Sequence, residues 1–517
     1  MQTGKQAEII RKALDNPDFI KNITCLKICL IQAKGVFMDF FNDLKEIIAI
    51  KSVLEAPPEG VKNAPFGAGN RAALDWFLKK AKAFGLKTGE VDGYAGWAEY
   101  GEGDECIGAL CHLDVVPAGE SWTYPPFELT EKNGRLYGRG VVDNKGAVVM
   151  CLHALKEIKA AKTKTNRRIR IIVGLNEEHG SACINHYVGH IENGGIPKMS
   201  FIPDAGFPVI NSEKGILHLQ VTIPLDSFFK KNIAYIEGGA SINVVPDGAT
   251  VSIFKDSPIG GIIEKLAQES AGGIIDNKLF SSPALAGEIL ASGASPNDYS
   301  IKTEADVYTI TTAGTAGHAM APDQADNAIW KIITALGALG GASSSPVVDF
   351  LTTYICNAKA TSKLGIYKSD EASGDVTLNA GIIEFDGDSN LRFTMDVRLC
   401  VSANVDEVKA NIEKALPKGG RMEVLRFSPN LYVSKDDPLV KTLLAVYKDK
   451  TGEDGYCVQT GGGTYARALL PAVAVAFGPT FDGKDSNLHK PDEYTDVDDF
   501  KKCAEIYKEA MIRLANC

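Results

Sequence analysis

Side chains that can bind a metal ion or move a proton follow several apolar, strand-like segments of this sequence. The segment 167–180, RRIRIIVGLNEEHG, ends in the adjacent carboxylates Glu177 and Glu178. Like charges side by side repel each other, and the end of a sheet is partly desolvated, so such a pair does little for stability. The segment CHLDVV supplies His112 and Asp114, which share one face of a strand because residues i and i+2 point the same way. Pairs of this kind indicate a site that performs chemistry.

Three more candidate ligands occur in loop-like stretches. Asp143 lies between glycines in GRGVVDNKG, Asp204 follows a proline in FIPDAGFP, and His489 lies in DSNLHKPDEY. Imidazole and carboxylate without thiolate suit zinc, manganese or cobalt. One ion needs three protein ligands and this set is larger, so two ions that share a bridging carboxylate would use it fully. Each residue also has an ordinary interpretation, as a structural histidine, a turn aspartate or a solvated glutamate, but all of these would have to hold at once.

The elements that must position these residues follow an α/β plan. From about residue 71, helical and strand patterns alternate, which predicts a mixed or parallel sheet flanked by helices, with functional groups at strand ends. Between 219 and 435, alternating strands mix with helices, which predicts a separate inserted α+β domain. Asp437 and Pro438 then form an N-cap and N1 pair that opens another helix. The inserted helices are predicted near 259–270, 326–338 and 405–416.

The predicted domain organisation has four segments. They are an N-terminal extension of unclear role (1–37), a first catalytic part (38–218), the inserted domain (219–435) and a second catalytic part (436–517). Met38 opens an amphipathic helix, so a translation start at Met38 is a hypothesis. The apolar run 19–35 is broken by Lys27, which disfavours a signal peptide.

Composition excludes several classes of protein. The chain has 517 residues, 45% of them hydrophobic and 23% charged, which is ordinary for a soluble globular protein. A net charge of -10 without a basic cluster argues against a nucleic-acid partner. No apolar run approaches the length of a membrane helix. Eleven cysteines without CxxC pairs suit a reducing cytoplasm better than a disulfide framework.

Several motifs resemble the M20 metallopeptidases, and more narrowly their dipeptidase V branch (PepV-like, carnosinase-type). The segments that carry the resemblance are HLDVVPAGESWTYPPFE, GRGVVDNKG, NEE, PDAGFP, SINVVPD and TGGGTYAR. The resemblance extends from about Met38 to the C-terminus. It implies an α/β fold, in which a mixed-sheet catalytic domain of the dinuclear-metallopeptidase type carries an inserted α+β lid domain.

The resemblance also implies two divalent metal ions, zinc in the first place and manganese or cobalt as alternatives. Asp143 would bridge the two ions. His112 and Asp204 would complete one site, and Glu178 and His489 would complete the other.

Three neighbours of the ligands have implied roles. Glu177 would be the general base, with an exchange of roles between Glu177 and Glu178 as the alternative. Asp114 would hydrogen-bond His112 and fix its tautomer. Asn144 stands where the family often has a second acid, and the family pattern implies a cis peptide between Asp143 and Asn144.

The inserted domain would bind the substrate. By resemblance, His318 would stabilise the tetrahedral oxyanion, and Asn243 and Arg398 would bind the substrate carboxylate. The glycines of 461–464, GGGT, lack the spacing of a phosphate loop, so their amides could instead reach that carboxylate. As isolated residues, the three side chains would be read as a core histidine, a turn asparagine and a strand arginine.

We therefore predict a cytoplasmic, monomeric metallo-dipeptidase that hydrolyses unblocked dipeptides by attack of a metal-bridging hydroxide, with neither a nucleic-acid nor a membrane partner. The prediction of a monomer follows from the large lid, which in the PepV type folds over its own active site. The nearest alternative is an N-acyl-amino-acid deacylase or desuccinylase. A two-metal phosphoesterase lacks support because no basic phosphate-binding cluster is present, and an inactive peptide-binding module would require a missing ligand.

Overall fold

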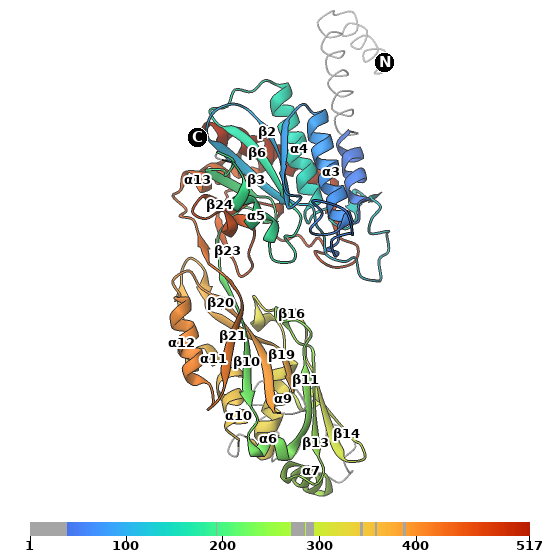
Figure 1. Ribbon diagram of the computed structural model, residues 1–517, viewed down its shortest axis with the longest axis vertical. Helices are drawn as coiled ribbons and strands as arrows, with labels where there is room; N and C mark the ends of the chain where they lie inside the picture. The colour runs from blue at the N-terminus through green and yellow to red at the C-terminus, as the bar shows by residue number, and fades with distance from the viewer. Residues whose placement is uncertain are drawn as a thin grey trace, which may run out of the picture. The chain divides into compact units, whose positions relative to one another are not determined.

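The computed structural model in Figure 1 describes residues 39–192, 194–269, 285, 294–341, 345–356, 359–385 and 389–517. The predictions for residues 1–37 and for a start at Met38 lie outside this part of the chain. Two compact units are present. Unit 1 contains the described residues up to Ile210 together with Val433–Cys457 and Thr464–Cys517, and unit 2 contains Asn211–Tyr432 and Val458–Gly463. The insertion was predicted at 219–435, whereas the units change at 210/211 and 432/433.

Unit 1 is built on a mixed sheet with the strand order β1-β2-β6-β3-β7-β24-β9. Strands β6, β3, β7 and β24 run parallel to one another, while β1, β2 and β9 pair with their neighbours antiparallel. The strands are β1 (Lys87–Val91), β2 (Ala95–Tyr100), β3 (Cys106–His112), β6 (Arg168–Gly174), β7 (Met199–Ile202), β9 (Val209–Glu213) and β24 (Val473–Ala476).

The parallel strands are buried because helices cover them. The middle strand β3 has no exposed residue, as expected for a strand with both faces covered. In register, His112 lies opposite Gly174, so β3 and β6 end at the same edge of the sheet. The helices of unit 1 are 39–48, α3 (Ala68–Ala83), α4 (Lys145–Ala160), α5 (Ala182–His190), α13 (Pro438–Thr451) and α14 (Val497–Asn516).

The helix-start signal predicted near residue 437 is confirmed. The Asp437 side chain accepts a hydrogen bond from the Leu439 backbone N–H, and Pro438 occupies the first turn of α13. Gly452 ends the helix with a left-handed φ of 83°. Unit 1 also contains a small sheet with the strand order β26-β5-β4. Its strands are β4 (Thr130–Lys132), β5 (Arg135–Tyr137) and β26 (Tyr494–Asp496).

Unit 2 contains an antiparallel sheet with the strand order β14-β15-β13-β11-β19-β20-β10-β21. Its strands are β10 (Gly215–Pro224), β11 (Ile233–Gly238), β13 (Gly248–Phe254), β14 (Tyr299–Thr303), β15 (Val307–Ala313), β19 (Thr377–Phe385), β20 (Asn390–Leu399) and β21 (Arg421–Ser428). Its main helices are α7 (Pro258–Glu269), α9 (Ala328–Leu336), α10 (Pro346–Phe350) and α12 (Val405–Ala415). The helices α7, α9 and α12 agree with those predicted in the inserted domain, whereas α10 was not predicted.

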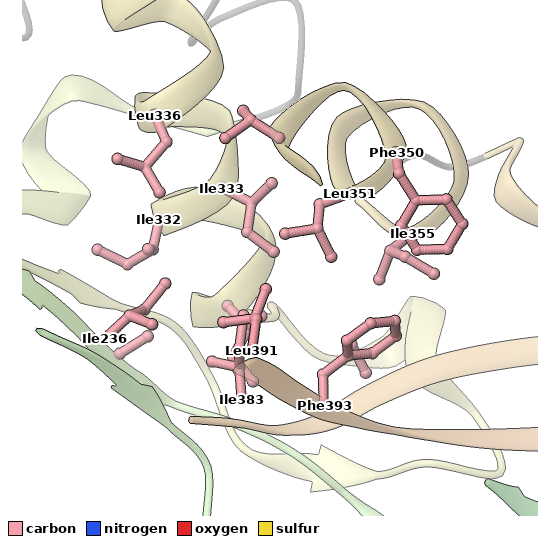
Figure 2. Close-up of a cluster of buried hydrophobic side chains, with 14 of the residues drawn as sticks. Ile236, Ile332, Ile333, Leu336, Phe350, Leu351, Ile355, Ile383, Leu391 and Phe393 are labelled. Atoms are coloured by element: carbon pink, nitrogen blue, oxygen red, sulfur yellow. The ribbon is translucent and has the colours of Figure 1, made fainter. Parts of the chain in front are cut away.

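The core of unit 2 lies between its helices and one face of the sheet. Figure 2 shows Ile332 and Ile333 of α9 above aliphatic side chains of the strands, and Phe350 and Ile355 above the aromatic ring of Phe393. The strand residues that it labels are Ile236, Ile383, Leu391 and Phe393, and all of them are buried. Apolar area removed from water in this way stabilises a fold by roughly 25 cal/mol per Å². The mixed α/β architecture predicted from the sequence is therefore present.

Within the described residues, no helix is both long and apolar enough to cross a membrane.

Candidate metal centre

The predicted metal ligands of unit 1 converge at the carboxyl edge of its parallel strands. His112 is the last residue of β3, Glu177 and Glu178 lie in the turn after β6, and Asp204 follows β7. The chain enters α4 directly after Asp143. Because parallel strands end at a common edge, residues far apart in sequence meet there. Two groups, His112–Glu177–Asp204 and His112–Asp143–Glu178, each place one ligand atom per residue within 4.8 Å of the others.

Asp143 lies between the two histidines. Its Oδ1 is 2.9 Å from His112 Nε2, and its Oδ2 is 3.0 Å from His489 Nε2. His112 Nε2 also lies 3.5 Å from Asp204 Oδ2, and His489 Nε2 lies 3.3 Å from Glu178 Oε2. The two oxygens of one carboxylate thus face two separate pairs of candidate ligands, His112 with Asp204 and His489 with Glu178. A bridging carboxylate requires this arrangement.

The turn that carries the two glutamates is held by Asp114. The Asp114 carboxylate accepts hydrogen bonds from the backbone N–H groups of Glu177 (3.0 Å) and Glu178 (3.1 Å). His112 Nδ1 lies 2.9 Å from the Asp114 carbonyl oxygen and 3.4 Å from its carboxylate. An N–H on Nδ1 therefore donates first to the carbonyl, which leaves Nε2 to face Asp143 and Asp204.

Asn144 connects three parts of the centre. Its Oδ1 accepts from the His112 backbone N–H at 3.2 Å, and its Nδ2 donates to Pro203 O (2.6 Å) and to Asp204 Oδ1 (3.1 Å). A second acid at this position could not donate to Asp204, so the amide holds this carboxylate without adding negative charge. The peptide bond between Asp143 and Asn144 is cis, as predicted.

The surplus of carboxylates shifts the pKa values of the centre. Burial, reinforced by the charge of Asp204, raises the pKa of Glu177 well above its usual value. Burial and the neighbouring Asp143 raise the pKa of Glu178 to about 7. Contacts with Asp143 and Glu178 raise the pKa of His489 to about 10. The centre therefore attracts protons, and divalent cations would take their place.

The residues fit the metal ions that the M20 resemblance implies. Glu178 Oε1 is buried and makes no hydrogen bond within the described part of the chain, and the buried His112 Nε2 faces two carboxylates with no other partner there. Buried polar atoms normally have a partner, and exceptions require an explanation. Both atoms belong to predicted ligands, and the surrounding donors are the imidazoles and carboxylates that suit zinc or manganese. The predicted ligands His112, Asp143, Glu178, Asp204 and His489 could hold two such ions, although one compact group contains Glu177, the predicted general base, and neither contains His489.

The predicted substrate-binding residues lie in unit 2, where two of them are neighbours. His318 ends β16 (Gly317–His318), which pairs with β12 (Val244–Val245) and places Val244 opposite His318. Asn243 precedes β12, and its carbonyl accepts from Ala319 N–H at 2.9 Å. His318 Nδ1 accepts from Met320 N–H at 3.0 Å, so the proton of the neutral ring lies on Nε2.

Arg398 is held by contacts within unit 2. Its Nε and Nη2 each donate to the Asp396 carboxylate at 2.7 Å, and its Nη1 donates to Gly461 O at 2.7 Å. These bonds use three of the five guanidinium N–H groups. The side of the guanidinium formed by Nε and Nη2 is taken by Asp396. The sequence prediction assigned Arg398 to a ligand but did not anticipate this partner.

Sequence reasoning also missed Glu493, which is fully buried and accepts four hydrogen bonds around the loop of Asp143. The segment HKPDEY could have pointed to Glu493, because an acidic residue follows His489 there by four positions.

Sequence reasoning missed Tyr465 as well. Its ring lies edge-on to His112 with the centroids 6.4 Å apart, and its hydroxyl is 3.0 Å from Cys183 Sγ.

Relatives support the assignment of these motifs. A model of the peptidase family M20/M25/M40 matches residues 109–513. The chain is 32% identical over 483 residues to "Putative dipeptidase YtjP" of Bacillus subtilis (strain 168), covering 92% of this chain and 97% of the relative. It is 30% identical over 485 residues to a "Putative dipeptidase" of Staphylococcus epidermidis, covering 92% and 96%.

Solved structures agree on the fold. Human carnosine dipeptidase 1 aligns with a TM-score of 0.52 at 16% identity, covering 93% of this chain and 98% of that one. The dipeptidase Dug1p of Saccharomyces cerevisiae aligns with a TM-score of 0.51 at 13% identity, covering 92% and 97%. Together with the family match, these findings confirm the predicted resemblance and the predicted fold class: the chain belongs to peptidase family M20/M25/M40.

Proposed function

We propose that this M20 peptidase is a dinuclear metal-dependent dipeptidase that hydrolyses unblocked dipeptides. The observation that carries the proposal is the position of Asp143, whose two oxygens lie 2.9 and 3.0 Å from the histidines of two separate pairs of candidate ligands. A carboxylate in that position suits two ions better than one. The names of the relatives, both dipeptidases, support the substrate class.

Each predicted ligand has a role in this proposal. His112 and Asp204 would hold one ion, Glu178 and His489 would hold the other, and Asp143 would be shared by both. The chemistry that divalent ions would supply there is a nucleophile at neutral pH and polarisation of the scissile carbonyl. Zinc is the first candidate, and manganese or cobalt would fit the same donors.

Glu177 acts as the general base in this mechanism. Its carboxylate takes a proton from the attacking water and passes it to the amine that leaves. The raised pKa of Glu177 suits this role, because it makes the carboxylate a stronger base than that of an exposed glutamate. The backbone hydrogen bonds of Asp114 hold Glu177 and Glu178 in one turn, so their carboxylates keep separate roles.

For unit 2 we propose that His318 stabilises the oxyanion and that Asn243 and Arg398 bind the substrate carboxylate. Neutral His318 carries its proton on Nε2, which makes that atom the donor. Arg398 keeps N–H groups on Nη1 and Nη2 beyond those that Asp396 and Gly461 occupy, and a planar fork of this kind suits a carboxylate.

A substrate panel tests the reaction class. The zinc-loaded and manganese-loaded proteins are assayed with a free dipeptide, its N-acetyl derivative and its C-terminal amide. We expect turnover of the free dipeptide and a large loss of kcat/KM for the amide, which lacks the carboxylate. Preference for the N-acetyl compound would instead identify a deacylase.

The variant Glu177→Ala tests the mechanism. We expect kcat to fall about 10²- to 10⁴-fold, the usual effect of removing a general base. Metal content, measured by inductively coupled plasma mass spectrometry, should stay at the wild-type value. Glu192→Ala, at an exposed glutamate of the same unit, is the matched control. Retained turnover in Glu177→Ala would contradict the assigned base, and lost metal would exchange the roles of Glu177 and Glu178.

We further propose that the protein is a cytoplasmic monomer, and that unit 2 is the lid inserted into the catalytic domain formed by unit 1. The size of the insertion supports this proposal, as do the cysteines of the described part of the chain, which are unpaired. Sedimentation at micromolar concentration should give the mass of one chain, and a dimer would contradict it.

A further inference from the structure

The loops that carry Asp143 and His489 are joined by the buried carboxylate of Glu493. Glu493 Oε1 accepts from the backbone N–H groups of Val142 (2.9 Å) and Asp143 (3.1 Å). Its Oε2 accepts from Gly140 N–H (3.0 Å) and from Arg139 Nη1 (2.7 Å). The side chain is 0% exposed. Each oxygen thus has two donors, so Glu493 organises the loop and is not itself free to bind a metal ion.

Further bonds connect the same two loops. The Gly138 backbone N–H donates to the Glu493 carbonyl at 3.1 Å, and Arg139 Nη2 donates to the Lys490 carbonyl at 3.3 Å. Arg139 is 1% exposed, so its charge and that of Glu493 compensate each other inside the protein. The two ligand loops therefore share one buried ion pair, although about 350 residues separate them.

The loop that carries His489 needs such support because its backbone is strained. Asn487, His489 and Asp492 adopt left-handed φ angles of 52°, 60° and 56°. Residues other than glycine rarely adopt this conformation, and it persists only where the surrounding structure imposes it. His489 is itself one of the strained residues and its side chain is 54% exposed, so packing alone does not fix the position of its imidazole.

We propose that Glu493 is a positioning residue of the metal centre, which sets the separation of Asp143 and His489 and thereby the metal affinity. The inference rests on the proposed function, because it assumes that these two residues bind metal. Glu493 holds the Asp143 loop by accepting from the backbone N–H groups of Gly140, Val142 and Asp143. It is tied to His489 because it lies four residues later in the same loop. A residue that orients a ligand in this way typically changes metal affinity 10- to 100-fold when it is replaced.

The variant Glu493→Gln tests the proposal. Glutamine keeps the shape, but its NH₂ group faces two donors whichever way the amide turns, so one pair of hydrogen bonds is lost. Metal-free full-length protein is titrated with Zn²⁺ and with Mn²⁺ in competition with a chromophoric chelator. We expect the dissociation constant to rise about 10- to 100-fold relative to wild type. Unfolding by urea in EDTA, measured in parallel, reports stability without metal.

Glu99→Gln is the matched control. Glu99 is also a buried carboxylate of unit 1, 4% exposed, and accepts from Arg168 Nη1 (2.6 Å) and Arg170 Nε (2.7 Å). It lies beside the amino end of β6, away from the metal ligands. This control should lose stability in EDTA and keep the wild-type metal affinity.

Arg139→Lys provides a milder test in case Glu493→Gln does not fold. Lysine keeps the charge beside Glu493 but cannot also reach the Lys490 carbonyl with a second nitrogen. We expect about a threefold or greater rise in the dissociation constant. Wild-type affinity in both variants, with only stability reduced, would overturn the inference and make Glu493 a structural ion-pair partner like Glu99. Wild-type protein that binds neither ion would overturn the proposed function itself.

Discussion

The two ends of strand β6 use charge in opposite ways. At its amino end, Arg168 and Arg170 donate to Glu99 at 2.6 and 2.7 Å, and Arg170 also donates to the Tyr187 hydroxyl at 3.0 Å. At its carboxyl end, Glu177 and Glu178 meet further carboxylates and two imidazoles, and the pKa values of both glutamates are raised, by burial first and then by neighbouring carboxylates. Both ends are buried and charged. At the amino end the two arginines share the carboxylate of Glu99, whereas at the carboxyl end carboxylates lie beside carboxylates.

The comparison separates structural charge from functional charge. At the amino end each charge has a partner, so the group needs nothing more. At the carboxyl end, the candidate ligand atom Glu178 Oε1 makes no hydrogen bond among the described residues, and His112 Nε2 faces only carboxylates. Buried carboxylates without compensating cations are unfavourable, so evolution would retain them only where a cation binds. Buried carboxylates that lie beside one another, more than the number of charged residues, thus mark the candidate site.

The largest expected effect is that of Asp143→Asn at the carboxyl end. A neutral amide cannot bridge two cations, so we expect kcat/KM to fall about 10³-fold or more, since metal stabilises transition-state charge by several kcal/mol. Metal content after dialysis should fall in parallel. Asp104→Asn changes an exposed aspartate near the amino end and serves as control. Full activity in Asp143→Asn would contradict the assignment of functional charge to the carboxyl end of β6 and structural charge to its amino end.

A smaller effect is expected from Arg170→Met at the amino end. Arg170 is 5% exposed and also stacks on Trp97, with its Cζ 4.2 Å from the ring centroid. Breaking a buried pair by removing one partner lowers the free energy of unfolding by about 3 kcal/mol, because Glu99 then stays buried with less compensation. Urea unfolding measures this change. Activity per folded molecule should be unaltered, and a lost metal affinity would mean that the two ends are coupled.

The smallest effect concerns Asp43, a second compensated carboxylate of unit 1. It accepts from Lys80 Nζ at 2.6 Å and lies 2.8 Å from His153 Nε2. Burial by itself raises the pKa of Asp43, but the hydrogen bonds from His153 and Lys80 outweigh it and lower that pKa. The stabilisation is therefore present above the unfolded pKa of about 4 and is lost as the pH falls through the folded value.

Asp43→Asn should thus lower the free energy of unfolding by about 1 kcal/mol at pH 7. The difference from wild type should shrink as the pH falls below about 4, which urea titrations at several pH values would detect. A difference that persists in acid would point to packing rather than to the carboxylate charge.

Much of the candidate site was predictable because its ligands lie at strand ends. His112, Glu177, Glu178 and Asp204 directly follow apolar runs, and such runs become parallel strands whose carboxyl ends meet. The helix start at Asp437 and Pro438 was predictable for a similarly local reason, since the cap forms between residues two positions apart. Local patterns of this kind do not depend on knowing the partner segment.

Glu493 and Asp396 were not predictable in the same way. Glu493 meets Arg139 across 354 positions, and nothing near either residue in the sequence specifies the other. Asp396 and Arg398 are close in sequence, but their pairing depends on the burial of both in β20, at 0% and 2% exposure. Burial is a property of packing, and it decides whether a charge is solvated or must find a partner.

By itself, then, the sequence determined which residue types stand at the ends of the strands, and through them the class of chemistry and the family. The tertiary structure alone decided that Asp143 faces two histidines, that Asp114 holds the turn of the two glutamates, and that Glu493 joins the two ligand loops. The physical reason is distance. Strand ends follow from local periodicity, whereas the separation of two carboxylates in a site depends on long-range packing that brings remote loops to the same edge of the sheet.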